Sequence, residues 1–248
     1  MLKEDILLEL EQHRSGYISG QALAGKYGVS RNAVWKAVNV LKKEGYKIES
    51  VTNRGYILRD DADILSQAGI MSRLKDARVH IIVHDKLDSS NNEAKRLLAA
   101  DCELDNTVIA CNEQLNGRGR NGSSFDSPAG SGVYMTVVFR LDQPAGSPEY
   151  VNKITAGAVA GAVSNLCGIA VSVNRSGGIY YNDNKIGGIL IEAVTGVESG
   201  YIGHIITGVG IAADVLDVSR NDLIAAITDC IISVYEGGEG SGSQSQLK

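Results

Sequence analysis

Long apolar runs are absent from this sequence, which limits where the protein can work. No stretch reaches the roughly 18 apolar residues that a membrane-spanning helix needs. The N-terminus, MLKEDILLELEQ, is a charged amphipathic segment and not a signal peptide. We therefore expect a cytoplasmic protein with no membrane association. Its 248 residues, 44% hydrophobic and 21% charged, suffice for one large or two modest globular domains.

Recognisable metal-ligand spacing is also missing. The four cysteines are scattered, without a Cys-x-x-Cys pair: Cys102, Cys111, Cys167 and Cys230. The four histidines follow no ligand spacing either: His13, His80, His84 and His204. The pattern favours buried free thiols in a reducing compartment over a disulfide framework, and it predicts no metal site.

Acidic residues exceed basic ones overall, but not at the N-terminus. Residues 1–58 hold nine lysines and arginines against six acids, which gives this segment a charge of +3. Because the whole chain carries −5, the remainder carries −8. A small basic segment on an acidic body predicts a polyanionic partner for that segment alone.

Residues 1–58 follow the pattern of a winged helix-turn-helix DNA-binding domain. A first helix is predicted by apolar residues at helical spacing: Leu2, Ile6, Leu7 and Leu10. Two short helices then flank a tight turn at Gly28, with Ser19 and Ser30 as their N-caps. The segment KIESVTNRGYIL follows as a two-stranded wing that turns at Asn53–Gly55. In this motif the second helix of the turn enters the major groove.

The outward face of that second helix supplies the candidate DNA contacts, while its apolar residues are expected to face inward: Val34, Ala37, Val38 and Leu41. We expect Arg31, Asn32 and Lys36 to contact bases in the major groove, with Ser30 and Trp35 beside them. Lys47 and Arg54 are expected to contact DNA phosphates. Two alternatives stay open. Such charge also solvates ordinary surfaces, and a lone tryptophan is commonly a packing residue.

The remaining chain predicts a second domain at residues 76–236. Residues 59–75 form a polar linker and a connecting helix, which we place at 64–74. Short apolar runs then alternate with helices at 89–101, 151–168 and 220–236. This order predicts an α+β fold, a mixed or antiparallel sheet with helices packed on one face. Residues 237–248, GGEGSGSQSQLK, are predicted to be a disordered tail.

Two segments offer polar groups to a small ligand. The stretch NGRGRNGSSFDSPAGSG surrounds Arg118 and Arg120 with glycines, which let backbone N–H groups approach an anion closely. In DSSNNEAK, Ser89, Ser90 and Asn91 stand where a strand gives way to a helix. The alternatives are a flexible solvated loop for the first segment and simple helix capping for the second. Gln114 adds a further amide, and the backbone of GVGIA (208–212) is expected at the pocket wall.

Four motifs in colinear order resemble the bifunctional biotin–protein ligases that also repress transcription: SRNAVWKAVNVLKKEGYKIES, LDSSNNEAK, GRGRNG and KIGGILIEA. The resemblance covers residues 1–236 and implies a winged helix-turn-helix domain followed by a biotin-ligase-like α/β domain. In that family, biotin and ATP form a biotinyl adenylate. The adenylate-bound protein then dimerises on an operator or biotinylates a carrier lysine.

The resemblance also implies the ligand-binding residues. The family's biotin contacts fall on Ser89, Ser90, Asn91 and Gln114, its adenylate loop on Gly117, Arg118, Gly119 and Arg120, and its covering aromatic on Phe125. Gly187 and Gly188 of KIGGILIEA complete the set. Several positions depart from the family pattern, because Ser90 replaces a threonine, Asn121 and Ser123 replace arginines, and Ala212 replaces an asparagine.

The family's lysine-bearing signature has no surviving residue in this chain. Asn174 stands where the family keeps its catalytic lysine. Adenylation needs positive charge on the developing oxyanion, and losing one such donor costs about 2.7–4 kcal/mol. We expect no substitute from Arg175, which strand alternation points to the opposite face, or from Lys185, where the family already tolerates lysine. The family's C-terminal barrel domain also has no counterpart.

The sequence therefore predicts a ligand-sensing transcription regulator without catalytic residues or a required cofactor. It is expected to bind a double-stranded DNA operator as a homodimer, with biotin, an adenylate or a related small molecule as effector. Two alternatives stay open. One is a slow, ATP-dependent biotin–protein ligase, and the other is a binding or assembly module without regulated DNA contact.

Overall fold

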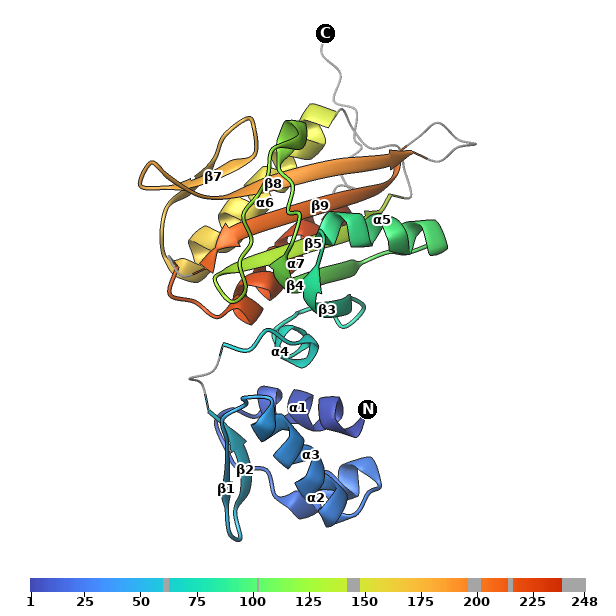
Figure 1. Cartoon of the computed structure of the whole chain (residues 1–248), viewed down its shortest axis with the longest axis vertical. Helices are drawn as coiled ribbons and strands as arrows, with labels where there is room; N and C mark the ends of the chain where they lie inside the picture. The colour runs from blue at the N-terminus through green and yellow to red at the C-terminus, as the bar shows by residue number, and fades with distance from the viewer. Residues whose placement is uncertain (60–62, 102, 142–147, 196–201, 214–215, 238–248) are drawn as a thin grey trace. The chain divides into compact units, whose positions relative to one another are not determined.

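The protein is described in a computed structural model, over residues 1–59, 63–101, 103–141, 148–195, 202–213 and 216–237. The chain divides into two compact units, Met1–Arg73 and Leu74–Lys248 (Figure 1). The predicted tail beyond Gly237 and residues 60–62 of the predicted linker lie outside the described residues.

The first unit is a helix-turn-helix domain with a two-stranded wing. Its elements are α1 (Leu2–Gln12), α2 (Gly20–Tyr27), α3 (Arg31–Lys43), β1 (Ile48–Val51), β2 (Gly55–Leu58) and α4 (Gln67–Met71). The predicted caps are present, because the Ser19 and Ser30 hydroxyls accept hydrogen bonds from backbone N–H groups at 3.0 and 3.2 Å. Gly28 ends α2 at φ +64°, a left-handed conformation that glycine adopts without a Cβ penalty.

The inward face of α3 is the predicted one. Its buried residues are Val34, Ala37, Val38 and Leu41, and they join Ile6 and Leu10 of α1 in one core. In the wing, β1 and β2 pair antiparallel, with Ile48 opposite Leu58. The wing turn brings the backbone of Gly55 against Ile18, whose main chain bridges to Tyr56. The segment between α1 and α2 is therefore held to the wing by backbone hydrogen bonds.

The connecting segment differs from its prediction. The helix expected over residues 64–74 is confined to α4, because the Ser66 hydroxyl caps Gly69 N–H at 3.0 Å and the helix ends at Ser72. Residues up to Arg73 also belong to the first unit. Arg73 donates to the buried carboxylate of Glu11 at 3.0 Å, and Ala68 lies in the first unit's core.

The second unit contains a mixed seven-stranded sheet. Its strands are β3 (His80–Leu87), β4 (Thr107–Gln114), β5 (Gly132–Arg140), β6 (Val171–Val173), β7 (Gly178–Tyr181), β8 (Asn184–Thr195) and β9 (Ile202–Ala212). They lie in the order β3-β4-β5-β9-β8-β7-β6, and only β3 and β4 are parallel. Its helices are α5 (Ser90–Ala100), α6 (Pro148–Cys167) and α7 (Arg220–Gly237).

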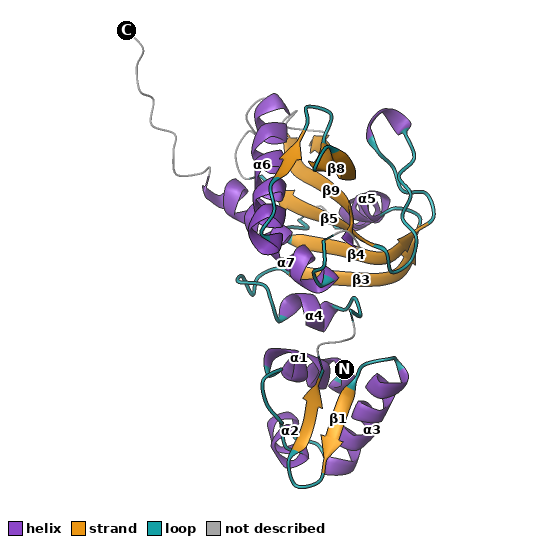
Figure 2. Ribbon diagram, turned by 90° about the vertical axis from the view of Figure 1, so that its left-hand side faces the viewer, coloured by secondary structure: helices purple, strands orange, loops and turns teal. Residues whose placement is uncertain are grey.

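Helices cover both faces of this sheet, so the prediction of helices on one face was wrong. Figure 2 shows α6 and α7 on one side of the sheet and α5 on the other. Thr136 of β5 bonds to α5, whereas Phe139 of the same strand stacks on Tyr235 of α7. Eight consecutive residues of β5 are buried, from Gly132 to Phe139, and such a strand needs a layer on each face.

The segment GIYYNDNKIGGIL forms the β7–β8 hairpin. Asn182 and Asp183 make the two-residue turn, with φ of +49° and +61°. Because β8 pairs with β9 along most of its length, the hairpin extends the sheet beside β9. It therefore brings residues 185–190 close to the ends of β5 and β9.

Among the described residues, no helix has the length and apolar content to cross a bilayer. Three cysteines of this part are free; Cys111 is buried, while Cys167 and Cys230 are half-buried. Burial raises the pKa of the Cys111 thiol to about 12. The fourth, Cys102, lies outside the described residues.

Two glycine substitutions are expected to change the stability of the first unit in opposite directions. Gly55 has φ +110°, and an added methyl group would overlap the Ile18 carbonyl oxygen. Gly55→Ala should therefore lower the free energy of unfolding by more than about 1 kcal/mol. Around Gly25, inside α2, nothing lies within 4 Å of an added carbon, so Gly25→Ala should raise it by about 0.5–1 kcal/mol.

Urea titration followed by fluorescence of Trp35, the chain's single tryptophan, measures both effects in this unit. Changes of the same sign in the two variants would contradict the backbone conformations described.

Candidate ligand-binding site and nucleic-acid interface

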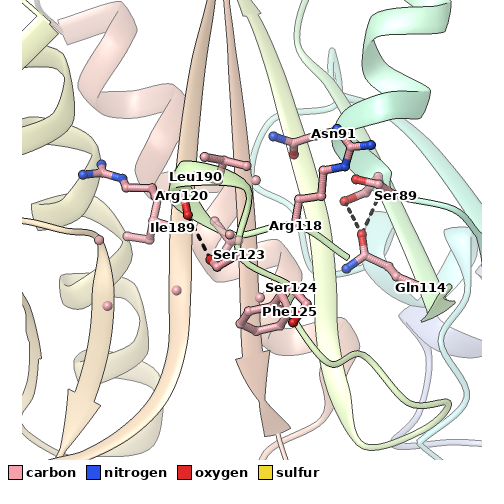
Figure 3. A pocket seen from close by; sticks show the side chains of 18 of the residues that line it. Ser89, Asn91, Gln114, Arg118, Arg120, Ser123, Ser124, Phe125, Ile189 and Leu190 are labelled. Carbon is pink, nitrogen blue, oxygen red and sulfur yellow. Dashed lines mark hydrogen bonds between the residues drawn. The ribbon is translucent and has the colours of Figure 1, made fainter. Parts of the chain in front are cut away.

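The second unit contains a cavity of about 250 Å³ beneath the glycine-rich loop (Figure 3). It lies between the N-terminus of α5, that loop, and strands β8 and β9. Nine of the eleven predicted ligand-binding residues line it: Ser89, Ser90, Asn91, Gln114, Arg118, Gly119, Arg120, Phe125 and Gly188. Gly117 and Gly187 lie outside its lining, in the loop and in β8. The structure thus brings together segments that are 100 residues apart in the chain.

A hydrogen-bond network holds the polar end of this cavity. Gln114 Oε1 accepts from the Ser90 backbone N–H at 2.9 Å and from the Ser90 hydroxyl at 3.2 Å. The Gln114 amide nitrogen donates to Ser127 Oγ at 2.9 Å. Behind them, the Thr136 hydroxyl lies 2.8 Å from Ser90 Oγ and 2.6 Å from Asn91 Oδ1. Because these groups are partnered and buried, they form a preorganised wall.

The Ser89 hydroxyl is the exception in this wall. The Ser89 side chain is 3% exposed and lines the cavity, and it makes no capping bond to α5. Within the described part of the chain its hydroxyl has no hydrogen-bond partner. A buried hydroxyl costs free energy when unpaired, so this group is available to a ligand.

Both the oxygen and the nitrogen of the Asn91 side-chain amide are hydrogen-bonded within the protein. Its oxygen faces Thr136, and its nitrogen donates to Glu192 Oε2 at 2.9 Å. Burial disfavours the charged form of Glu192, but the bonds from Lys95 and Asn91 outweigh it, so the pKa of this carboxyl is lowered. Asn91 therefore positions α5 and presents little free hydrogen-bonding capacity to a ligand.

Two glycines of β9 let the side chains of Asn91 and Phe125 pack directly against the backbone of this strand. A Cβ at position 208 would overlap the Asn91 side chain, and one at 210 would overlap the Phe125 ring. Phe125 also packs edge-on against Tyr134, with ring centroids 6.5 Å apart. The expectation that GVGIA brings bare backbone to the pocket wall is therefore confirmed for Gly208 and Gly210.

The glycine-rich loop forms a hydrogen-bonded hairpin, and most of its residues are exposed to solvent. Phe125 N–H donates to the Gly117 carbonyl at 2.8 Å, and Gly119 N–H donates to the Ser123 carbonyl at 2.7 Å. A single helical turn, Arg120–Gly122, forms its tip. This geometry fixes Phe125 over the cavity.

Arg120 contributes to the cavity lining, but its guanidinium is bonded to groups outside the polar end of the cavity. Its guanidinium donates to Asn152 Oδ1 of α6 at 2.8 Å and to the Arg175 carbonyl at 2.9 Å. Figure 3 shows this side chain pointing away from Ser89 and Gln114. Arg120 therefore fastens the loop to α6 and to the chain after β6.

The segment aligned with the family's lysine signature is a turn. Strand β6 ends at Val173, so the strand alternation expected for Arg175 does not apply. Asn174 Oδ1 accepts from Ser176 N–H at 3.1 Å and from Gly178 N–H at 2.8 Å, and its amide nitrogen lies 3.3 Å from the Tyr180 hydroxyl. Asn174 and Arg175 line a neighbouring cavity of about 610 Å³. Neither residue lines the ligand cavity.

Sequence reasoning missed several groups at the site. Lys185, dismissed from the sequence, lines the ligand cavity together with Tyr180. Thr136 was missed as well, although a polar residue inside the apolar run GVYMTVVFR marks it. The described residues contain no group of three or more potential metal ligands.

The first unit presents a groove between α3 and the wing. Its volume is about 670 Å³, and no acidic residue lines it: Ser19, Gly20, Gln21, Arg31, Asn32, Trp35, Ser50, Val51, Thr52, Asn53, Gly55 and Tyr56. Trp35 is 55% exposed and stands outside the core of its unit, so the packing alternative does not hold. Polar and aromatic groups on an exposed helix beside a wing suit a base-pair edge.

The other predicted DNA contacts surround this groove. Ser30, Lys36 and Lys47 are exposed and lie outside its lining. Arg54 is exposed on the wing, with its guanidinium 4.5 Å from the centroid of the Tyr17 ring. The structure therefore gathers Arg31, Asn32 and Trp35 in the groove and leaves the lysines on its margins.

Two family models match the chain, one in each unit. The model described as "HTH domain" matches residues 3–57. The model described as "Biotin/lipoate A/B protein ligase family" matches residues 87–211. These ranges contain the groove of the first unit and nearly all the lining of the ligand cavity.

Similar proteins match most of the chain. The bifunctional ligase/repressor BirA of Bacillus subtilis (strain 168) is 32% identical over 212 residues, which are 85% of this chain and 64% of that protein. The bifunctional ligase/repressor BirA of Escherichia coli (strain K12) is 29% identical over 194 residues, 78% of this chain and 58% of that protein. This chain therefore spans less than two thirds of the length of these relatives.

Solved structures share the fold of the second unit. A biotin protein ligase from Aquifex aeolicus, in complex with biotin and ATP, superposes with a TM-score of 0.53 at 16% identity, over 65% of this chain and 72% of that one. A biotin protein ligase from Leishmania major, in complex with biotin, gives 0.52 at 19% identity, over 70% and 85%. At these identities the likeness shows the fold alone.

Two threonine substitutions test the network behind the cavity. Thr136→Val removes the hydroxyl that serves Ser90 and Asn91, and it should lower the free energy of unfolding by about 1–3 kcal/mol. Thr228, on α7, is the matched control because its buried hydroxyl has no hydrogen-bond partner in the described part of the chain. Thr228→Val should be neutral or stabilising. Chemical denaturation followed by circular dichroism measures both, and an equal loss in the two variants would show that the network contributes nothing.

Proposed function

We propose that this chain, which belongs to the biotin/lipoate A/B protein ligase family and carries a helix-turn-helix domain, is a ligand-responsive DNA-binding regulator. The second unit senses a small molecule in the cavity under the glycine-rich loop. The observation that carries the proposal is the use of Asn174, because its amide is occupied by its own turn and lines a different cavity.

The proposed ligand is biotin or a molecule of similar shape. Ser89 offers an unpaired hydroxyl, and Ser90 and Gln114 form the polar wall beside it. Phe125 supplies an apolar ring above the bare backbone of Gly188 and Gly210. A small cavity with a few convergent polar groups is typical of a specific ligand site.

The proposed loss of ligase activity follows from charge. Adenylation places negative charge on a phosphoryl oxygen, and the neutral Asn174 amide cannot neutralise it. Arg120, the nearest intact arginine of the loop tip, is bonded to Asn152 and to the Arg175 carbonyl. The chain would then bind its ligand without joining it to a nucleotide, so no cofactor is required.

The proposed output is DNA binding by a homodimer. Ser30, Arg31, Asn32, Trp35 and Lys36 are assigned to the operator groove, and Lys47 and Arg54 to phosphates. One winged module binds DNA weakly, and two half-sites supply the missing affinity. Ligand binding would act by shifting the equilibrium between monomer and dimer.

A second candidate function is a biotin–protein ligase, favoured by Lys185 in the ligand cavity. The two candidates differ in one product. Only the ligase transfers biotin to the lysine of an added biotin-carrier domain when ATP and magnesium are present. Mass spectrometry of that domain separates them.

Calorimetric titration with biotin tests the proposed ligand. We expect saturable heat with the unmodified protein and an affinity at least about tenfold lower for Ser89→Ala, since a buried donor is lost. Ser233→Ala, on an exposed position of α7, is the control and should bind as the unmodified protein does. Absence of heat with the unmodified protein would remove biotin as the ligand.

Gel-shift titration tests the DNA interface, using a duplex selected from a random library by the unmodified protein. Lys36→Ala should weaken binding by about 1–3 kcal/mol and leave the biotin titration unchanged. Lys86→Ala removes the same charge from an exposed lysine of the second unit and should change neither measurement. Failure of the unmodified protein to select any duplex would contradict the assignment of a DNA-binding regulator.

A further inference from the structure

The ligand cavity carries positive charge in an acidic part of the protein. The chain beyond residue 58 has a net charge of −8, yet no aspartate or glutamate lines the cavity. Its charged lining consists of Arg118, Arg120 and Lys185. A site lined by one sign of charge attracts a ligand of the other sign.

The two arginines are already engaged. The Arg120 guanidinium is bonded to Asn152 and to the Arg175 carbonyl. Arg118 interacts electrostatically with Glu192, the carboxylate that also binds Asn91 and Lys95. Arg120 is therefore paired with an amide oxygen and a carbonyl oxygen, and Arg118 with a carboxylate, without any ligand.

Lys185 differs from the arginines. It is exposed at the start of β8, where it pairs across the hairpin with Tyr180. Over the described ranges its ammonium group has neither a hydrogen-bond nor an ion-pair partner. Lys185 is also close to the turn that contains Asn174. Its cross-strand partner Tyr180 has its hydroxyl 3.3 Å from the Asn174 amide nitrogen.

The position of Lys185 defines the far end of the site. The sheet order places β4, β5, β9 and β8 side by side, so Gln114 and Lys185 lie three strand spacings apart, or about 14 Å between backbones. Neutral hydrogen-bonding groups, Ser89 and Gln114, lie at the first end. Between the two ends the Phe125 ring lies over Gly188 and Gly210, and Leu190 adds an apolar side chain to the same lining.

We propose that Lys185 binds a carboxylate at the tail of the ligand and selects for it. The ligand is then an elongated molecule with a neutral polar head, an apolar middle and a carboxylate tail. This inference rests on the proposed function, since it assigns one end of the same cavity. The expectation that Lys185 does not replace the catalytic lysine stays a prediction, because the role assigned to Lys185 is binding without a transfer step.

Biotin and biotinol are the probes that test this proposal, because they differ only in that biotinol has a neutral hydroxyl in place of the carboxylate. Calorimetric titrations of the full chain compare the unmodified protein with Lys185→Gln. The matched control is Lys153→Gln, which removes the same charge from an exposed lysine of α6 lining the neighbouring cavity.

The unmodified protein should bind biotin about tenfold or more tightly than biotinol, the strength of a charge-assisted hydrogen bond. Lys185→Gln should lose this preference by weakening biotin alone, and Lys153→Gln should keep it. The preference should also shrink at high salt, because exposed charges are screened. These three results together support the role assigned to Lys185.

Equal affinity of the unmodified protein for both probes would overturn the role of Lys185 and leave the proposed regulator intact. Equal weakening of both probes in Lys185→Gln would also overturn it, because the lysine would then act only through the fold. Absence of heat with either probe would reject the carboxylate assignment together with the biotin-like ligand. Unchanged DNA selection in that case would show that the DNA-binding proposal survives.

Discussion

The hydrogen bonds between Thr136 of β5 and the first turn of α5 position the polar wall of the ligand cavity. They hold Ser90 and Asn91 against the sheet, and they require a bare glycine at position 208 beneath Asn91. Ser90 then holds Gln114, and Gln114 holds Ser127 at the base of the glycine-rich loop. One buried hydroxyl on the central part of the sheet thus connects a helix, two strands and a loop, because each partner in the chain of bonds positions the next.

The other side of the cavity is bordered by a tight turn between β6 and β7. Asn174 and Gly177, at φ +77°, close a tight turn between β6 and β7, and Arg120 ties that turn to α6. These bonds make the neighbouring hairpin a firm edge of the cavity. Under the proposed function, such a site keeps its shape and its positive lining without the group that assists phosphoryl transfer. Such a site suits recognition of a ligand more than its conversion.

Much of the fold could be predicted from the sequence because local rules agree with the tertiary structure. The caps at Ser19 and Ser30 and the Gly28 turn are decided within a few residues, and all are confirmed. The two-sided covering of the sheet was missed because a run such as GVYMTVVFR was not used to infer burial on both faces. The hydrogen-bond partners of Arg120 and the position of Lys185 at the cavity could not be predicted for another reason. Both depend on which distant segment lies alongside, and spacing along the chain carries no such information.

The central claim is that the family's ligand cavity persists here without its adenylation chemistry. Isotope exchange between pyrophosphate and ATP, dependent on biotin and magnesium, measures that chemistry directly and needs no carrier protein. We expect saturable biotin binding by calorimetry. We also expect an exchange rate about 10²–10³-fold lower than that of a complete ligase measured in parallel. Exchange at the rate of the complete ligase would contradict the claim.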